Sequence, residues 1–367
     1  MSKPIGVGII GANPEKSWAA LAHIPALKSL PEFRIAALST SRKESALAAA
    51  KLFGVDNAFD NHIDLVNHPD VDLVVVAVKV PQHLELVSAA LRAGKAVYCE
   101  WPLGNGLAET LDLAEMARQA GVVAAIGLQA RAAPAVNYVR DLIRDGYVGE
   151  VLSTTLVGSG MNWGQVIEQN YAYTADASNG VTMLSIAIGH TMDAVCYCLG
   201  EVSELTATMA QRRTSFTVLE TQKSEPMTSA DQVAFSGLLQ GGAAFSVHYR
   251  GGMSRGTNML WEINGTEGDI QMSAVAGQAQ MFELSVSGAR GDSNVLAPLT
   301  VPSQYYWVPE QPEPGFSLNV AQAYSRLARD IREGTQLCAT FDDAVLRHRL
   351  IHAVEEAASS GIRRNIE

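Results

Sequence analysis

Short, largely apolar runs alternate with amphipathic helical segments along the first third of the chain. The predicted strands share this apolar character and are Ile5–Ile10, Arg34–Leu38, Leu73–Val78, Ala96–Cys99 and Val122–Ile126. The predicted helices are Trp18–Leu30, Lys43–Phe53, Gln82–Ala93 and Leu107–Ala120. Apolar strands that alternate with helices are typical of a parallel sheet covered on both faces. The pattern therefore predicts a doubly wound Rossmann domain over residues 1–130, with its ligand at the carboxyl ends of the strands.

The pattern changes after Gln129. A helix at Pro134–Asp145 is followed by strand-like segments, namely Val151–Val157, Glu204–Met209, Gln232–Leu239, Ala243–Tyr249, Met259–Asn264 and Ile270–Met272. Runs of strands without intervening helices predict a large, mainly antiparallel open sheet. Residues 131–367 are thus predicted to form an α+β domain for substrate binding and oligomerisation. Its closing helices, Asn319–Arg332 and Asp342–Ser359, could pack back on the first domain.

Composition narrows the function. The net charge of -11 argues against a nucleic-acid surface, which needs cations to neutralise phosphates. The longest apolar stretch, Val71–Val80, is too short to span a bilayer. The four cysteines lack the spacing of a zinc site or a redox pair, so neither a metal nor a disulfide is expected and a reducing cytoplasm is the expected location.

A glycine-rich stretch at the start of the chain is the first candidate for dinucleotide binding. Gly6, Gly8 and Gly11 match the dinucleotide fingerprint, but the first two fall inside the predicted strand, where they cannot reach a phosphate. Only the turn after the strand can do so. The predicted phosphate-binding residues are Gly11, Ala12, Asn13, Lys16, Ser17 and Trp18. An ordinary strand-to-helix turn, with Ser17 as helix cap, explains the same residues.

The end of the second strand lacks the carboxylate that would bind the ribose hydroxyls of NAD. Thr40, Ser41 and Arg42 stand there instead. Hydroxyl groups and a guanidinium suit a 2′-phosphate, so this segment favours NADP over NAD. A solvated helix start remains the alternative.

Several longer motifs resemble the Gfo/Idh/MocA family of sugar and polyol oxidoreductases. They are Ala77–His83, Gly94–Leu103, Gly127–Arg131, Leu142–Glu150, Asn179–Val181, Gly189–Asp193 and Asn264–Asp269. A second set of motifs is Lys16–Trp18, Val78–Pro81, Glu100–Trp101, Ser178–Val181, Gly189–Thr191 and Tyr249–Gly252. Within the family, these motifs most resemble the branch of the fungal galactose-regulon repressor and its bacterial relatives. The resemblance implies a Rossmann domain that binds NAD or NADP, followed by a sheet domain that assembles into a homodimer or homotetramer.

The resemblance also implies roles for single residues. Further cofactor contacts are expected from Lys79, Pro81, His83, Glu100, Trp101 and Gln129. His190 is the expected acid/base and Asp193, three residues later, could orient it or hold a backbone amide. Packing or helix capping is the alternative role of His83.

This sequence departs from the enzyme pattern of the family at two positions. Trp101 stands where active members carry a lysine, and Ile186 where they often carry an aspartate. A tryptophan cannot exchange a proton, and proton-transfer help is worth about 10²–10⁴-fold in rate.

The resemblance further implies that aromatic and polar residues near the start of the second domain border the substrate. They are Arg131, Asn162, Trp163, Tyr171 and Tyr173. A subunit interface would use the same aromatic residue types.

Three functions follow from these observations. The first is an NAD(P)-dependent oxidoreductase acting on a sugar, polyol or sugar derivative through His190. The second is a catalytically silent, dinucleotide-binding regulator that grips a protein partner. The third is an NAD-assisted redox-elimination glycosidase or lyase. None of the three requires direct contact with nucleic acid or a membrane.

Overall fold

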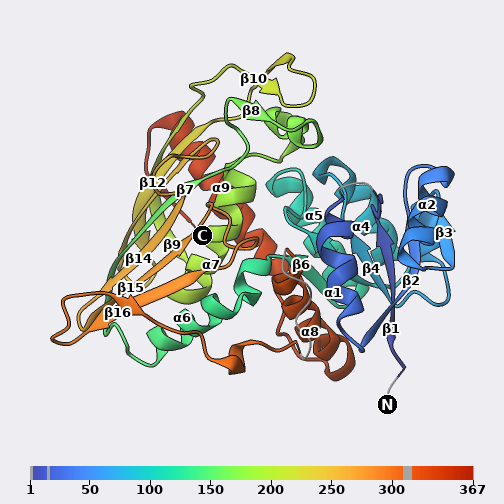
Figure 1. Cartoon of the computed structure of the whole chain (residues 1–367), viewed down its shortest axis with the longest axis horizontal. Coiled ribbons are helices and arrows are strands. Elements are labelled where there is room, and N and C mark those ends of the chain that lie inside the picture. Colours follow the sequence, from blue (N-terminus) through green and yellow to red (C-terminus); the bar gives the residue numbers. More distant parts are fainter. Residues whose placement is uncertain (1–2, 15–16, 309–315, 367) are drawn as a thin grey trace. The chain divides into compact units, whose positions relative to one another are not determined.

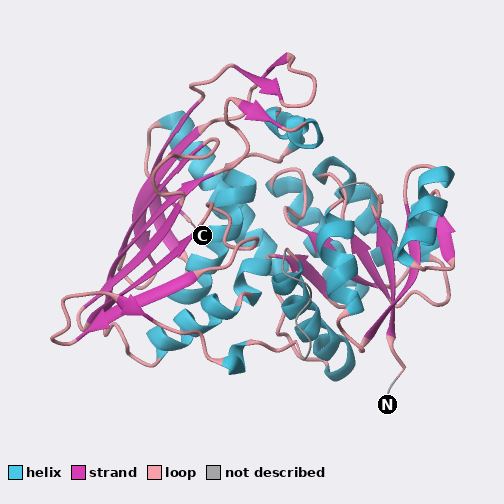
Figure 2. Cartoon of the chain, in the orientation of Figure 1, coloured by secondary structure: helices cyan, strands magenta, loops and turns pink. Residues whose placement is uncertain are grey.

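The chain forms two units, each with its own sheet (Figures 1 and 2). The computed structural model describes residues 3–14, 17–308 and 316–366. Met1–Ala132 and Tyr306–Leu346 make up the first unit, Ala133–Tyr305 and Arg347–Glu367 the second. In the described ranges, no helix combines the length and apolar character needed to cross a membrane.

The first unit contains a six-stranded parallel sheet in the order β3-β2-β1-β4-β5-β6, which confirms the predicted doubly wound architecture. Its strands are β1 Ile5–Ile10, β2 Phe33–Ser39, β3 Asn57–Phe59, β4 Leu73–Val76, β5 Ala96–Glu100 and β6 Ala124–Gly127. Strand β3 was not predicted, because three half-buried residues carry no periodic signal. The strand order reverses between β1 and β4, the point at which ligands bind in such sheets.

Helices flank this sheet. They are α1 Ile24–Lys28, α2 Lys43–Phe53, α3 His62–Val66, α4 His83–Arg92, α5 Leu107–Ala120, α8 Ser317–Glu333 and the start of α9 Phe341–Ser360. The single helix predicted over Trp18–Leu30 is a π-helical turn, Ala19–His23, followed by the short α1. Helix α8 packs on α1 in the first unit, with Leu27, Tyr324 and Leu327 in one apolar core.

The strand glycines of β1 are present for packing. A side chain at Gly6 would collide with the carbonyl of Asp70, and one at Gly8 would come within 2.7 Å of Leu65. The chain leading into β4 therefore passes directly against β1. The two residues serve close packing, as their position inside the strand indicates.

The second unit contains a nine-stranded sheet in the order β17-β16-β15-β14-β7-β13-β12-β9-β18. Its strands are β7 Val151–Ser159, β9 Val202–Ala210, β12 Gln232–Leu239, β13 Ala244–Arg250, β14 Met259–Gly265, β15 Gly268–Ala274, β16 Ser285–Arg290, β17 Ala297–Pro298 and β18 Arg364–Asn365. Within this sheet, β13 and β7 are the one parallel pair among the described strands, which confirms the mainly antiparallel prediction. A smaller sheet holds β8 Val166–Ile167, β10 Ser215–Val218 and β11 Ser224–Pro226.

One face of the large sheet is buried and the other is open. Along β13, Phe245 and Val247 are buried, whereas Ser246 and His248 between them are exposed. The helices of this unit are α6 Pro134–Arg144, α7 Gly189–Leu199 and the remainder of α9. A π-helical turn, Leu184–Ile188, leads directly into α7.

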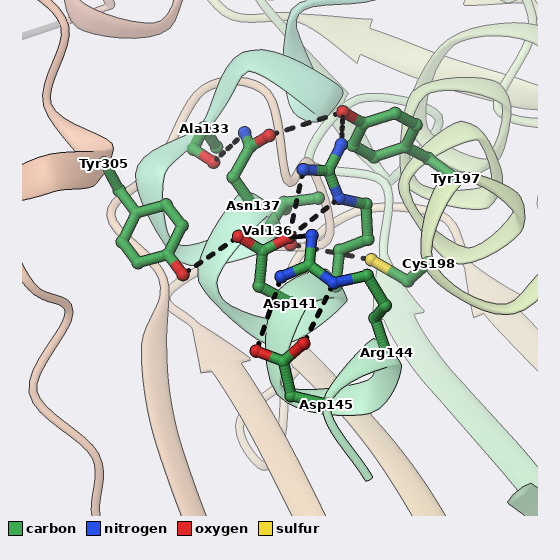
Figure 3. A network of polar contacts seen from close by, with 10 residues as sticks. Ala133, Val136, Asn137, Asp141, Arg144, Asp145, Tyr197, Cys198 and Tyr305 are labelled. Carbon is green, nitrogen blue, oxygen red and sulfur yellow. Dashed lines mark hydrogen bonds and ion pairs between the residues drawn. The ribbon is translucent and has the colours of Figure 1, made fainter. Parts of the chain in front are cut away.

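Helix α6 is tied to its surroundings by a polar network (Figure 3). The Arg140 guanidinium donates to the hydroxyl of Tyr197 on α7 and lies 4.7 Å from the centre of its ring. Asp141 accepts from Arg144 at 2.9 Å and from the Tyr305 hydroxyl at 3.1 Å. These bonds join α6 to α7 and to the turn at Tyr305, so this arginine-rich cluster is structural.

Candidate functional site

A cleft of about 440 Å³ opens at the carboxyl edge of the first sheet. It lies among the ends of β1, β2 and β3 and the segment between β4 and α4. The predicted cofactor residues that line it are Gly11, Asn13, Thr40, Ser41 and Arg42. Of the others, Ala12 is buried, while Lys79 and Pro81 are exposed in the loop between β4 and α4.

Gly11 shapes the floor of the cleft. Its φ angle is +99°, in the left-handed region, and a side chain there would collide with the carbonyl of Ala77. Its N–H donates to the carbonyl of Ser39 at 2.9 Å, which joins the ends of β1 and β2. The glycine therefore lets the end of β1 pack closely against the segment that follows β4, at the edge of the cleft.

Some polar groups of the turn after Gly11 already form hydrogen bonds with neighbouring residues of the chain. The Ser17 hydroxyl donates to the carbonyl of Asn13 at 2.6 Å and accepts from the N–H of Ala20 at 3.2 Å. Ser17 therefore caps the π-helical turn, as its alternative role predicts. Trp18 packs against Phe316 with ring centres 5.9 Å apart. Lys16 lies outside the described residues.

Hydroxyl groups order the Arg42 side of the cleft. The backbone carbonyl of Arg42 accepts from Thr40 Oγ1 and from Ser45 Oγ, both at 2.9 Å, and the two hydroxyls lie 2.7 Å apart. Arg42 immediately precedes α2, whose first turn presents unpaired N–H groups. Among the residues the structure describes, the exposed Arg42 makes no ion pair, so its guanidinium remains available to an anion.

His83 is buried, and both of its ring nitrogens face backbone carbonyls. Nδ1 lies 2.9 Å from the oxygen of Pro102 and Nε2 3.1 Å from that of Val78. Desolvation lowers the pKa of His83, so the ring is neutral near pH 7 and donates to one carbonyl at a time. It links the ends of β4 and β5, and its ring nitrogens are already engaged.

Glu100 and Gln129 meet at the carboxyl ends of β5 and β6. Glu100 Oε1 accepts from Gln129 Nε2 at 2.7 Å. A side chain at Gly127 would come within 2.8 Å of that oxygen, so the glycine lets the carboxylate lie against β6. Desolvation raises the pKa of the buried Tyr98 and Tyr324, and the nearby charge of Glu100 raises it further.

Two further predicted residues of the first unit are buried or paired. Trp101, directly after β5, is buried. Arg131 forms an ion pair with Asp343, with Nη1 and Oδ1 2.9 Å apart. That pair holds the segment after β6 to the start of α9.

The second unit carries the predicted acid/base. His190 is buried in the first turn of α7, and Ile186 lies in the π-helical turn before it. Asp193, one turn further on, is fully buried, with Oδ1 3.7 Å from Nε of Arg347 on α9. Arg347 also donates to Cys196 Sγ at 2.8 Å and pairs with Glu201. The Asp193 carboxylate is thus neutralised by a buried arginine, which suits a residue that orients α7.

The predicted aromatic substrate contacts differ in exposure. Trp163 is fully buried and its Nε1 donates to the carbonyl of Thr174 at 2.9 Å, so its ring belongs to the core. Asn162 beside it is half-buried. Tyr171 is 39% exposed and Tyr173 half-buried, and desolvation raises the pKa of both.

The structure adds residues that the sequence patterns did not indicate. Asp60, Asn61, His62, Gln82 and Glu85 also line the cleft. Three of these follow β3, whose existence no pattern predicted. Three further buried polar residues lie in predicted helices, namely His23, Tyr324 and Arg347. In the sequence, only their position on the apolar face of a helix could have indicated a special role. In the described part of the chain, no histidine, cysteine and carboxylate groups gather as a metal site.

Family models match both units. Residues 5–128 match the oxidoreductase family with an NAD-binding Rossmann fold, and residues 134–274 match the C-terminal domain of Gal80p. The first unit is thus similar to the oxidoreductase Rossmann family, and much of the second to the C-terminal domain of Gal80p. The Rossmann match covers the strands and loops that form the cleft.

Individual relatives include both enzymes and regulators. The chain is 38% identical to the dehydrogenase aclE of Aspergillus oryzae over 214 residues, which are 56% of this chain and 58% of that protein. It is 29% identical to the galactose/lactose metabolism regulatory protein GAL80 of Saccharomyces cerevisiae, over 80% of this chain and 73% of the other. It is 25% identical to levoglucosan dehydrogenase of Pseudarthrobacter phenanthrenivorans, over 97% of this chain and 95% of the other.

Solved structures show the same fold. A super-repressor mutant of Gal80p from Saccharomyces cerevisiae superposes with a TM-score of 0.89 at 24% identity, covering 99% of this chain and 98% of that one. Levoglucosan dehydrogenase in complex with NADH and L-sorbose gives 0.85 at 21% identity, covering 99% of each chain. The fold therefore occurs in a transcriptional regulator and in an NADH-binding sugar dehydrogenase.

Proposed function

We propose that this protein is an NAD(P)-dependent oxidoreductase that acts on a sugar, a polyol or a related alcohol. The observation that carries the proposal is the cleft at the carboxyl edge of the first sheet. Gly11 lines its floor, in close contact with the segment after β4, and Arg42 with its hydroxyl neighbours lines its side. The dehydrogenases among the relatives make hydride transfer the chemistry to test first.

The same cleft supports a preference for NADP. Neither residue 39 nor residue 40, at the end of β2, is a carboxylate that could bind ribose hydroxyls, and Arg42 offers a guanidinium to a 2′-phosphate. Asp60 and Glu85 also line the cleft and would oppose a second negative charge. Glu85 is 75% exposed with His62 at 3.7 Å, so solvent and that ring moderate its effect.

His190 is the proposed acid/base, because a histidine exchanges protons near neutral pH. In the oxidation of an alcohol, His190 would accept the proton that the hydroxyl group releases as the hydride leaves the carbon. Asp193 and Arg347 hold the helix that carries His190. The bound dinucleotide supplies the hydride acceptor.

A turnover assay tests the proposal. NAD or NADP is added with a panel of pyranoses and polyols, and the absorbance of the reduced nicotinamide is followed. Sustained reduction is expected, faster with NADP than with NAD. Dinucleotide binding without reduction of any substrate in the panel would contradict the oxidoreductase.

A regulator that binds a dinucleotide without turning it over is the second candidate. Trp101 favours it, because an indole at this position can stack but cannot transfer a proton. This candidate predicts binding of the dinucleotide, no reduction, and capture of a protein partner that depends on the dinucleotide. Glycoside cleavage in the same assay would instead indicate redox elimination.

A further inference from the structure

Four segments of the first unit meet in one buried polar cluster behind the carboxyl edge of the sheet. His23 ends the π-helical turn that follows the loop after β1, and its side chain is fully buried. Its Nδ1 lies 2.7 Å from the hydroxyl of Tyr324 on α8. Its Nε2 lies 2.9 Å from Oε1 of Glu100, which also accepts from Gln129.

The hydrogens of this cluster follow from its chemistry. A carboxylate oxygen only accepts, so a ring nitrogen 2.9 Å away must carry a hydrogen, and His23 Nε2 is protonated. Burial raises the pKa of Tyr324, which therefore keeps its hydroxyl proton and can donate it to His23 Nδ1. Tyr324 thus selects the ring form that presents an N–H to Glu100. The ring N–H does not point at Oε1 in hydrogen-bond geometry, so the pair is held by the proximity of the N–H dipole to the carboxylate charge.

The two oxygens of Glu100 have different surroundings. Oε1 faces both His23 and Gln129. Oε2 has no hydrogen-bond partner among the residues the structure describes and is not enclosed, and 13% of the side chain is exposed. One oxygen is anchored, while the other remains free to accept a hydrogen bond from outside.

The position of this free oxygen suits a particular part of a dinucleotide. Glu100 ends β5, and the cleft with Arg42 lies at the end of β2, three strands away in the order β2-β1-β4-β5. Neighbouring strands are about 4.8 Å apart, so the two ends are separated by about 14 Å across the reversal point of the sheet. A dinucleotide whose adenosine half fills the cleft would bring its nicotinamide half toward β5. That half offers donors, the ribose hydroxyls and the carboxamide N–H.

We propose that His23 and Tyr324 are positioning residues that hold Glu100 so that its free oxygen accepts a hydrogen bond from the nicotinamide half of the dinucleotide. The inference rests on the proposed function, because it requires a bound dinucleotide. His23 acts through Glu100, and Tyr324 acts through His23. A purely structural cluster would stabilise the fold without distinguishing the two halves of the ligand.

The test compares the whole dinucleotide with its adenosine half. Binding of NADH and NADPH is measured by nicotinamide fluorescence, and binding of ADP by calorimetry. We expect His23→Leu to weaken both dinucleotides about tenfold, since Glu100 loses the ring N–H that lies against it, and to change ADP binding less than about twofold. His23→Gln, which keeps a donor toward Glu100, should restore most of the affinity.

A double variant shows whether His23 acts through Glu100. Glu100→Gln alone should weaken the dinucleotide, and His23→Leu added to it should weaken it no further. Tyr324→Phe keeps the aromatic ring in the core, so this variant replaces His23→Leu in the binding test if His23→Leu does not fold. It should weaken the dinucleotide about threefold and leave ADP unchanged, because it removes only the partner that selects the ring form.

The failures are distinguishable. An equal loss of ADP and dinucleotide binding in the variants, or additive losses in the double variant, would overturn this inference and leave the proposed function intact. A wild-type chain that binds ADP and dinucleotide with equal affinity would also overturn it. A wild-type chain that binds neither would overturn the proposed function itself.

Discussion

Arg42 is the residue on which the choice between NADP and NAD depends. Replacing Arg42 by alanine should weaken NADP about 10- to 100-fold and NAD much less, because only NADP offers a 2′-phosphate to the guanidinium. Calorimetric titration of both dinucleotides measures the difference. Lys51→Ala, at the other end of α2, is the matched control. Equal losses for the two dinucleotides would contradict the assignment.

Gly11 combines a left-handed backbone with a close neighbour. Gly54 has a similar φ, +73° against +99°, but nothing lies within 4 Å of a side chain placed there. Gly54→Ala should therefore cost only the backbone strain of about 1–2 kcal/mol in unfolding free energy. Gly11→Ala should cost at least about 1–3 kcal/mol more from overpacking against Ala77, and it should abolish dinucleotide binding. Urea unfolding of the two variants measures the difference. Equal losses of unfolding free energy would contradict the close contact at Gly11.

Among the secondary-structure elements, helix α8 contributes buried side chains to the core of the first unit. Leu327 is fully buried there, whereas Arg329 on the same helix is exposed and pairs with Glu333. Leu327→Ala should lower the unfolding free energy by about 2–5 kcal/mol. Arg329→Ala should change it by less than about 1 kcal/mol. A small effect of Leu327→Ala in chemical denaturation would mean that α8 is not part of that core.

Helix α9 carries a buried histidine that should make stability depend on pH. Desolvation lowers the pKa of His348 from 6.5 to about 3. Below pH 6.5 the unfolded chain therefore binds a proton at His348 that the folded chain does not bind. The contribution of His348 to the unfolding free energy is complete above pH 6.5 and is lost as pH falls toward 3.

The loss should approach about 1.4 kcal/mol per pH unit within that window. Unfolding free energies at successive pH values measure it in the wild-type chain and in His348→Leu, whose curve should be flatter. His352→Leu, on the same helix but 52% exposed, should follow the wild-type slope. Identical slopes for all three chains would refute this origin.

At the scale of the whole molecule, the proposed acid/base His190 belongs to the second unit and the cleft to the first. His190→Ala should lower turnover about 10²–10⁴-fold and leave dinucleotide affinity unchanged, because the acid/base and the cleft belong to different units. Steady-state kinetics and dinucleotide titration on the same preparation separate the two effects. A parallel loss of binding would show that His190 acts on the fold of the first unit.

Homodimers or homotetramers remain the predicted assembly. Light scattering measures the molar mass in solution that tests this prediction.

The sequence by itself determined the kind of sheet in each unit, because hydrophobic periodicity reports burial directly. It located α2 and α5 at their observed bounds, since each ends at a glycine with a left-handed backbone. It also indicated that Gly11, and neither Gly6 nor Gly8, belongs to the turn. Thr40, Ser41 and Arg42, which line the cleft, could be singled out because the Rossmann topology predicts a ribose contact at the end of the second strand.

Only the tertiary structure decided how buried polar groups are partnered. Contacts between residues far apart in the chain leave no periodic signal, so His23 with Tyr324 and Asp193 with Arg347 were not predicted as pairs. The same holds for His83, whose nitrogens are taken by two backbone carbonyls. Residue types showed which chemistry was available, whereas burial and distance showed which groups are already engaged and which, such as the outer oxygen of Glu100, can still meet a ligand.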